Sequence, residues 1–298
     1  MQYHKSVLLK ESVDALEVSN GGVFVDVTFG GGGHSREILR RAEGCSLYSF
    51  DQDEDAIEND LDDERLTLIH SNFSELENSL KLYRIMEVDG VLADLGVSSH
   101  QFDAEERGFS IRFDGPLDMR MGKDLEKTAT DIINEYSWEE LAEMLRSYSD
   151  LKGAGRIARR IKDVHQYSPL KRTSELVEVV KKIAPPNKQN KFLAQVFQAL
   201  RIEVNNEMKV LREMLQQTVN VLKPGGRLVV ISYHSIEDRL VKNFMRSGDF
   251  SGEEKKDFFG NSLSPFKVIT RKPIVPTEFE IENNNRARSA KLRVAKKV

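Results

Sequence analysis

The chain has 298 residues, enough for one large domain or two with a sizeable core. Hydrophobic residues make up 39% and charged residues 31%, a composition that excludes a disordered chain. The formal net charge of -4 excludes a uniformly basic nucleic-acid coat, although not a local basic surface. The longest apolar runs are too short to span a bilayer, and no secretory signal is visible, so we expect a cytoplasmic protein without membrane contact.

A single cysteine, Cys45, excludes an intrachain disulfide and a cysteine zinc site. We expect Cys45 to be a small buried residue at the start of a strand. The sequence contains no obvious cluster of metal ligands, so we expect no protein-bound metal.

Four short β-rich runs in the first third of the chain alternate with helical segments, and a fifth run lies much further on. This alternation is typical of βαβ units and a parallel sheet. The runs are Gly22–Phe29, Ser46–Asp53, Leu66–Phe73, Asp89–Val97 and Arg227–Ser235.

The region from about 123 to 198 contains no convincing strand. Ser137 and Glu140 form a capping box, which predicts a helix start. We therefore expect a discontinuous α/β domain at 1–110 and 205–298, interrupted by a mostly helical subdomain at 111–204.

The pattern after the helical region predicts a return to the sheet. A helix is expected over 204–222, followed by a tight turn at Lys223-Pro224-Gly225-Gly226. A sixth strand is expected at 266–269 and a loop at 247–264. The alternation of apolar and basic residues over 289–298 predicts an edge strand.

Positive charge is concentrated in one segment. Between Leu151 and Arg201 there are twelve Lys and Arg residues against three acids, a net charge of +9, so the rest of the chain carries -13. Solvated helix faces would explain this, but the size of the asymmetry favours a site for a polyanion.

A glycine-rich turn follows the first predicted strand. Gly30-Gly31-Gly32-Gly33-His34 leads into a helix, and Asp51 ends the second strand. Such a turn lets a ligand approach the backbone, and a carboxylate at the end of the second strand can bind both hydroxyls of a ribose. The spacing does not fit a dinucleotide fingerprint. Together with Phe73 and Asp94 at the next strand ends, it favours S-adenosyl-L-methionine, whose amino and sulfonium groups are cationic.

Long sequence blocks resemble the RsmH (MraW) family of bacterial methyltransferases. The blocks include DVTFGGGGHS at 26–35, ERGFSIRFDGPLDMRM at 106–121 and ISYHSIEDR at 231–239, and they begin with HKSVLL at 4–9. The resemblance implies a Rossmann-like class I methyltransferase sheet with an inserted helical subdomain. It also implies methyl transfer from S-adenosyl-L-methionine to N4 of a cytidine in the decoding region of 16S ribosomal RNA.

The resemblance further implies a set of cofactor-binding residues, which are Gly32, Gly33, His34, Asp51, Phe73, Asp94 and Gln101. It implies the assembled small ribosomal subunit as substrate and a homodimer as a further expectation. The chain departs from the family at Lys191–Gln195, where an arginine is replaced by Gln195, and at Lys152–Gly155. Both departures affect the expected RNA contacts.

Catalysis needs a hydrogen-bond acceptor for the cytosine amino group. The turn Asp94-Leu95-Gly96-Val97 lacks the prolines and the aromatic residue that many amino-methyltransferases carry there. The acceptors are therefore backbone carbonyls of this turn or Asp94 itself. His234 is a second candidate, for base positioning or proton relay, with a packed structural histidine as the alternative.

Arginines are the candidates for RNA contact. Arg156, Arg159 and Arg160 share one helix face by their spacing. Arg120 binds a phosphate or organises the pocket together with Asp118 and Asp238. Trp138 either stacks on a base or, as we favour, packs in the insertion.

Three other functions compete with this hypothesis. A small-molecule or protein methyltransferase would carry a neutral insertion, and a nucleotide-dependent oxidoreductase would carry a dinucleotide fingerprint. An RNA-binding assembly factor without catalysis would have lost Gly30–His34 or Asp51, and both are intact.

Overall fold

The computed structural model describes residues 6–18 and 21–298, with only the backbone of Ser99, so His4 and Lys5 of the first matching block lie outside the described residues. The chain forms two compact units. The sheet unit comprises Met1–Gly96 and Lys209–Val298, and the helical unit comprises Val97–Met208. The boundaries of the insertion predicted from the sequence were 111 and 204. Among the described residues, no helix combines the length and the apolarity needed to cross a membrane.

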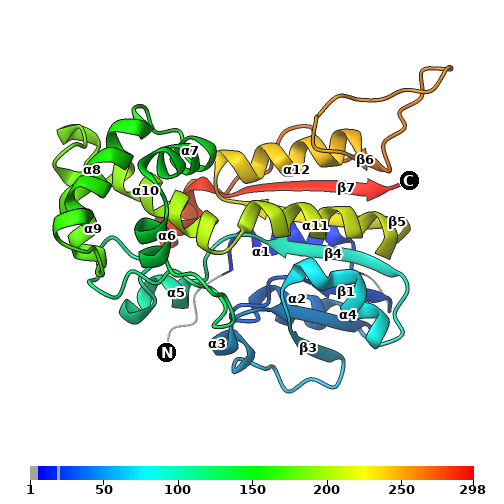
Figure 1. Cartoon of the computed structure of the whole chain (residues 1–298). Helices are drawn as coiled ribbons and strands as arrows, with labels where there is room; N and C mark the ends of the chain where they lie inside the picture. Colours follow the sequence, from blue (N-terminus) through cyan, green and yellow to red (C-terminus); the bar gives the residue numbers. More distant parts are fainter. Residues whose placement is uncertain (1–5, 19–20) are drawn as a thin grey trace. The chain divides into compact units, whose positions relative to one another are not determined.

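The sheet unit contains a seven-stranded sheet of order β3-β2-β1-β4-β5-β7-β6 (Figure 1). Its elements are α1 (Leu9–Leu16), β1 (Val23–Asp26), α2 (Gly33–Arg41), β2 (Ser46–Asp51), α3 (Glu54–Ile57), β3 (Leu66–His70), the 3-10 turn η1 (Phe73–Glu75), α4 (Leu76–Leu82), β4 (Val88–Asp94), α11 (Glu207–Val221), β5 (Leu222–Ser232), α12 (Ser235–Ser247), β6 (Phe266–Val268), α13 (Glu278–Asn283), η4 (Asn285–Ser289) and β7 (Lys291–Lys297).

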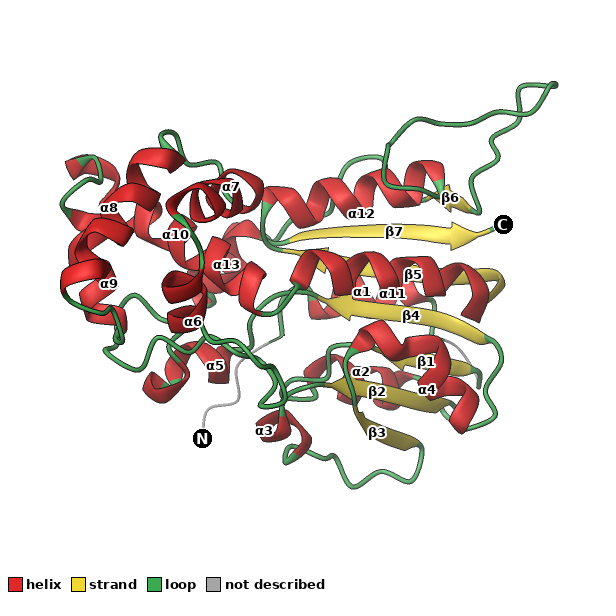
Figure 2. Ribbon diagram, in the orientation of Figure 1, coloured by secondary structure: helices red, strands yellow, loops and turns green. Residues whose placement is uncertain are grey.

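The first five strands are parallel, as predicted. Their central residues, such as Val91 on β4 and Val229 on β5, are fully buried because helices cover both faces of a parallel sheet. Helices α1 and α2 lie on one face, and α4 and α11 lie on the other (Figure 2). The carboxyl ends of β1 to β5 therefore meet at one edge, where ligands of open α/β sheets bind.

The C-terminal strand corrects one prediction. β7 is not an edge strand, because it pairs antiparallel with β5 on one side and with β6 on the other. The edge strand of the sheet is β6. Arg293, one of the basic residues of this strand, is 6% exposed and pairs with Asp238 on α12. A partner on the neighbouring helix thus allows a charged residue inside the sheet.

The Lys223–Gly226 segment forms an irregularity in a strand, whereas a turn before the strand was expected. β5 already begins at Leu222, which pairs with Val88, and the next paired residues are Gly90 and Arg227. The extra residues bulge out of the ladder, with Gly225 at φ +89°. The other expectations here are confirmed: β6 forms at 266–268, and Cys45 is 2% exposed just before β2.

The helical unit has its own hydrophobic core, built around Leu145, Ile157 and Leu200. The predicted capping box of Ser137 and Glu140 opens α7, and the segment contains no strand between residues 123 and 198, as expected. The helical elements are α5 (Ser99–Asp103), η2 (Glu105–Arg107), α6 (Ala129–Glu135), α7 (Trp138–Tyr148), α8 (Ala154–Tyr167), α9 (Thr173–Lys181), η3 (Pro186–Lys188) and α10 (Gln189–Val204).

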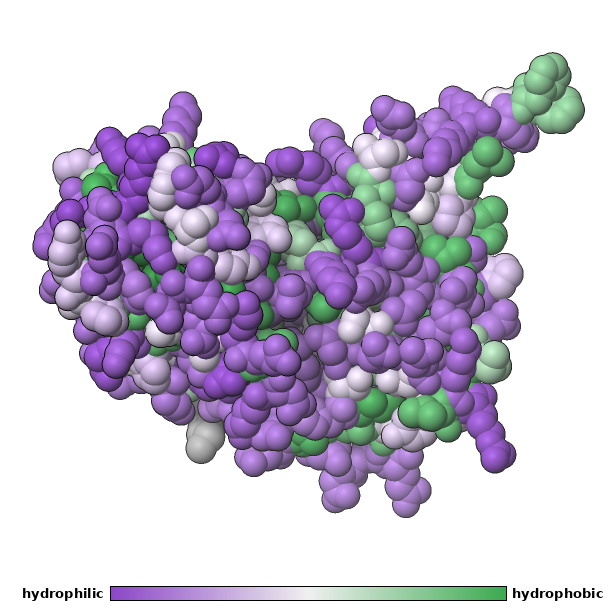
Figure 3. All heavy atoms as spheres, in the orientation of Figure 1, coloured by the Kyte–Doolittle hydropathy of each residue, from purple (hydrophilic) through white to green (hydrophobic). Residues whose placement is uncertain are grey.

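The expected loop after α12 runs from residue 248 to 265 and projects from the sheet unit (Figure 1). Phe258 and Phe259 on this loop are 98% and 85% exposed, and their rings meet edge to face. Hydrophobic atoms are visible at the tip of the projecting loop (Figure 3).

Candidate active site

The glycine-rich turn joins β1 to α2 and leaves backbone accessible. Gly30 and Gly32 have φ of +54° and +70°, which residues with a Cβ rarely adopt. A Cβ on Gly32 would lie 2.9 Å from the ring of Phe29, and one on Gly33 would collide with the side chain of Ser6. Nothing lies within 4 Å of a Cβ built on Gly30 or Gly31. The turn therefore requires glycines where it is packed and offers open backbone beside them.

Asp51 ends β2 next to this turn. Its Oδ2 accepts the backbone N–H of Gly30 at 2.8 Å, and its Oδ1 accepts that of Asp53 at 2.9 Å. Burial raises the pKa of the Asp51 carboxyl to about 6, although these two N–H donors lower it. An ionised carboxylate accepts about four hydrogen bonds, so Asp51 keeps capacity for two further donors, as a ribose diol would supply.

Asp94 ends β4 and contacts two other side chains of the sheet unit. Its Oδ1 accepts the hydroxyl of Tyr233 at 2.7 Å, and its Oδ2 lies 3.7 Å from Nδ1 of His34. Burial raises the pKa of Asp94 to about 6, while His34 and the Tyr233 hydrogen bond lower it. The His34 ring is not solvent-facing, because it is 4% exposed and its Nε2 lies 3.2 Å from the carbonyl of Val7. A carbonyl only accepts, so Nε2 carries a proton.

A third carboxylate, which the sequence analysis did not select, links these strand ends. Asp26, the last residue of β1, is fully buried and accepts the hydroxyl of Ser35 at 2.7 Å. Ser35 also bonds Ser49 on β2 at 2.8 Å. Thr28 accepts the backbone N–H of Asp94 at 2.6 Å and donates to Asp26. The network fixes the ends of β1, β2 and β4 against α2.

Phe73 and Gln101, the other two predicted cofactor residues, belong to different units. Phe73 is half-buried at the start of η1, where Asn72 caps the turn. Gln101 belongs to α5 of the helical unit and is 5% exposed. Its side chain accepts the backbone N–H of Ser98 at 3.1 Å and so completes a capping box.

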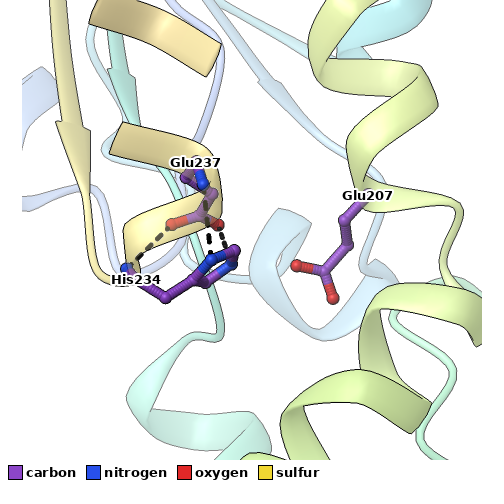
Figure 4. A group of neighbouring side chains, drawn as sticks. All are labelled: Glu207, His234 and Glu237. Carbon is purple, nitrogen blue, oxygen red and sulfur yellow. Dashed lines mark hydrogen bonds and ion pairs between the residues drawn. The ribbon is translucent and has the colours of Figure 1, made fainter. Parts of the chain in front are cut away.

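His234 is the N-cap of α12, a role that its sequence position did not reveal. Its Nδ1 accepts the backbone N–H of Glu237 at 3.4 Å, and its Nε2 lies 3.0 Å from Oε1 of the same residue (Figure 4). Glu237 in turn accepts the backbone N–H of Tyr233 at 2.9 Å. These contacts favour the structural alternative for His234.

The three remaining candidates from the signature blocks, Asp118, Arg120 and Asp238, are held in ion pairs. Arg120 forms a bidentate pair with Asp118, at 2.8 and 2.9 Å, and donates to the carbonyl of Leu125 at 3.0 Å. Asp238 pairs with Arg293 at 2.6 Å. Arg120 therefore organises its own loop, and most of its guanidinium N–H groups already donate to Asp118 and Leu125.

The helical unit carries exposed cations. Arg156 and Arg159 are exposed on α8 and Arg160 is half-buried, while Arg159 stacks over Trp138 with its Cζ 3.9 Å from the ring centroid. Trp138 is partly buried against the core of this unit. Within the described residues, several further exposed cations have no ion-pair partner: Lys152, Lys171, Lys181, Lys182, Lys188 and Lys191.

The open backbone and the carboxylates at this edge of the sheet suit a nucleoside linked to a cationic group. Open backbone at Gly30 and Gly31 lies beside Asp51, whose carboxylate has unused acceptor capacity. Asp94 supplies a second carboxylate at the same sheet edge. The residues present therefore fit S-adenosyl-L-methionine.

The strand order and the strand-end site define a class I S-adenosylmethionine-dependent methyltransferase, which confirms the predicted fold class and methyl donor. The model of the MraW methylase family matches residues 1–298, and the chain belongs to that family.

Curated relatives match over their whole length. Proteins named ribosomal RNA small subunit methyltransferase H, from Flavobacterium johnsoniae and Parabacteroides distasonis, are each 54% identical. The alignments cover 100% and 99% of this chain, and 99% and 98% of the relatives. Among solved structures, an rRNA methylase from Streptococcus thermophilus has a TM-score of 0.38 at 12% identity, covering 97% of this chain and 93% of that one.

Proposed function

We propose that this protein transfers a methyl group from S-adenosyl-L-methionine to N4 of a cytidine in the decoding region of 16S ribosomal RNA. Family membership and the rRNA-based names of relatives at 54% identity support an rRNA substrate. The observation that carries the proposal is the division of charge. The sheet unit has half-buried carboxylates with raised pKa values at its strand ends, Asp51 and Asp94, and the helical unit has exposed, unpaired cations.

In this proposal Gly32, Gly33, His34, Asp51, Phe73, Asp94 and Gln101 hold the cofactor. The open glycine turn and the free acceptor capacity of Asp51 support contacts with the nucleoside. The carboxylate of Asp94 supports binding of a cationic or amino group. Phe73 is half-buried at the start of η1, shortly after β3, which leaves part of its ring available to an adenine.

The cytosine amino group is a poor nucleophile because its lone pair is delocalised into the ring. S-adenosyl-L-methionine, when bound, supplies the methyl group and a sulfonium leaving group. The protein must align the amino group and exclude water. We assign Asp94, ionised above about pH 6, as the acceptor that hydrogen-bonds the amino protons as positive charge develops on N4. His234 acts in this scheme as the cap that holds the Tyr233–Glu237 segment in place.

RNA contact is assigned to the exposed face of α8. Arg156, Arg159 and Arg160 are available to phosphates, and Arg159 with Trp138 presents a planar cation. The ion pair of Arg120 with Asp118 supports an organising role for that arginine over phosphate binding. The assembled small subunit as substrate, the homodimer and the cytoplasmic location remain predictions.

Methyl transfer from labelled S-adenosyl-L-methionine to small ribosomal subunits lacking this modification tests the proposal. We expect label in N4-methylcytidine after nucleoside analysis, and loss of that label with Asp51→Ala. Label at another nucleoside would reject the N4-cytidine assignment. Unlabelled RNA with intact cofactor binding would reject the rRNA substrate and favour the small-molecule or protein methyltransferase.

A further inference from the structure

Tyr233 connects three elements of the sheet unit at the strand-end site. It lies between the end of β5 and the N-cap of α12, and its backbone N–H donates to Glu237 at 2.9 Å. Its hydroxyl donates to Oδ1 of Asp94 at 2.7 Å. Neither the glycine turn nor the spacing of the acidic residues points to this tyrosine.

The turn after β4 is built around the ring of Tyr233. Gly96 has φ +105°, and a Cβ on it would lie 3.3 Å from Cδ2 of that ring. The backbone of Asp94 is already fixed, because its N–H donates to Thr28 and the next N–H donates to Ile231. Only the side chain of Asp94 can therefore still rotate, and the Tyr233 hydroxyl restrains it through a hydrogen bond to Oδ1.

The surroundings keep this hydroxyl a donor. Burial raises the pKa of Tyr233 well above its ordinary value, and Asp94 and Glu237 raise it further. A phenol held protonated next to a carboxylate can only donate to it. Oδ1 of Asp94 thus already accepts one hydrogen bond, while Oδ2 faces Nδ1 of His34 at 3.7 Å, beyond hydrogen-bond distance.

We propose that Tyr233 is a positioning residue for methyl transfer. Its hydroxyl orients the Asp94 carboxylate and favours its ionised form, leaving Oδ2 to accept a hydrogen bond from the reacting amino group. This inference rests on the proposed function, since it gives Asp94 the acceptor role. The other titratable groups that face Asp94 are His34 from α2, Asp26 from β1 and Glu237 from α12.

Tyr233→Phe tests the inference, because it removes the hydroxyl and keeps the ring beneath Gly96. The Asp94 titration is followed in ligand-free protein by carbon-13 NMR of labelled aspartates and is assigned with Asp94→Asn. Loss of one hydrogen bond to a charged group should raise the Asp94 midpoint by about one pH unit. The Asp51 midpoint should stay in place, because Asp51 has no contact with Tyr233, and it serves as an internal reference.

The acidic limb of the pH profile of kcat/KM should shift to higher pH by the same amount as the Asp94 midpoint. Activity should fall about fivefold at pH 6 and recover largely at pH 8.5, at an unchanged melting temperature. Tyr48→Phe on β2, whose ring lies 5.7 Å from that of Tyr83, is the matched control and should change neither quantity. In an Asp94→Asn background, Tyr233→Phe should have no further effect on the pH profile.

An Asp94 midpoint that stays in place in Tyr233→Phe would overturn the inference. So would a shifted midpoint with an unshifted kcat/KM profile, since Tyr233 would then act on Asp94 without affecting the reaction. If the wild-type protein labels no RNA, the proposed function fails, and the NMR midpoint alone decides whether Tyr233 controls Asp94.

Discussion

The sheet unit and the helical unit use charge in opposite ways. In the sheet unit, Asp26, Asp51 and Asp94 are drawn into strand ends and held by backbone and hydroxyl donors. In the helical unit, cations such as Arg156 and Lys181 stand in solvent without ion-pair partners among the described residues. Buried carboxylates depend on individual hydrogen bonds, whereas surface cations act through a summed, salt-screened field. We therefore expect sharp single-residue effects in the sheet unit and graded effects in the helical unit.

The largest effect is expected for Asp51→Asn. The substitution removes the negative charge. It also places the amide NH2 of the asparagine against a backbone N–H, that of Gly30 or of Asp53, which then has no acceptor. Calorimetric titration should show roughly 100-fold weaker binding of S-adenosylhomocysteine, consistent with the loss of two charge-assisted hydrogen bonds. Asp62→Asn is the control, since Asp62 is exposed and has φ +52°, a conformation that asparagine tolerates. Comparable loss in both variants would contradict the role of Asp51.

A smaller, graded effect is expected for the double variant Arg156→Gln with Arg160→Gln. Binding to a 16S RNA fragment should weaken about tenfold at moderate salt, and the slope of log K against log salt should fall by about two. Binding of S-adenosylhomocysteine should not change. Arg146→Gln is the matched control, because Arg146 is exposed on α7 but paired with Glu143. An unchanged salt slope in the double variant would remove α8 from the RNA-binding surface.

A smaller effect is expected from the pH dependence of the free energy of unfolding, through carboxylates of the sheet unit. The pKa values of Asp51 and Asp94, about 6, lie above the ordinary 3.8, so the folded form binds more protons than the unfolded form between about pH 4 and 6. These two groups therefore increase the free energy of unfolding as pH falls through that window. Glu37, with its pKa lowered to about 2 by Arg40, acts in the opposite direction, but only below about pH 4.5.

Denaturant unfolding of the ligand-free protein at pH 7 and pH 5 measures this effect. The gain in stability at pH 5 should shrink in Asp51→Asn, while binding of S-adenosylhomocysteine by the wild type should weaken severalfold at the same pH. The same gain in the variant and the wild type would show that Asp51 titrates as an ordinary carboxyl.

The smallest effect is expected at His234. His234→Ala removes the N-cap of α12 and should cost about 1 kcal/mol, or a melting temperature lower by about 2 to 4 °C. His234→Asn restores a capping side chain and should restore stability. Both variants should keep kcat near the wild-type value. A large fall in kcat for His234→Asn at normal stability would instead assign His234 to the reaction.

Sequence patterns predicted the sheet well because periodicity and turn residues are local properties. The five parallel strands and the cap at Ser137 follow from such signals. The position of β7 does not, because apolar–basic alternation is the same for an edge strand and for an inner strand whose arginine has a buried partner. Asp238, 55 residues before Arg293, supplies that partner.

The candidate cofactor residues, which remain predictions, come in part from their position and in part from the resemblance. Gly30–Gly33 and Asp51 follow from the known geometry of strand-to-helix turns. Tyr233 and Asp26 were missed, since their roles depend on contacts with Asp94 and Ser35 from other strands and helices. The ion pair of Arg120 is short-range, but neither its bidentate geometry nor its carbonyl contact has a sequence signature.

The place of β7 in the sheet has a consequence for synthesis. β5 pairs with β4 on one side, but its other neighbour is made from residues 291–297. A chain emerging from the ribosome therefore exposes one edge of β5 until these residues are translated and released. The helical unit, whose hydrophobic core lies within residues 97–208, can form earlier. Truncation within β7 should thus yield a nascent chain with a folded helical unit and an aggregation-prone open sheet.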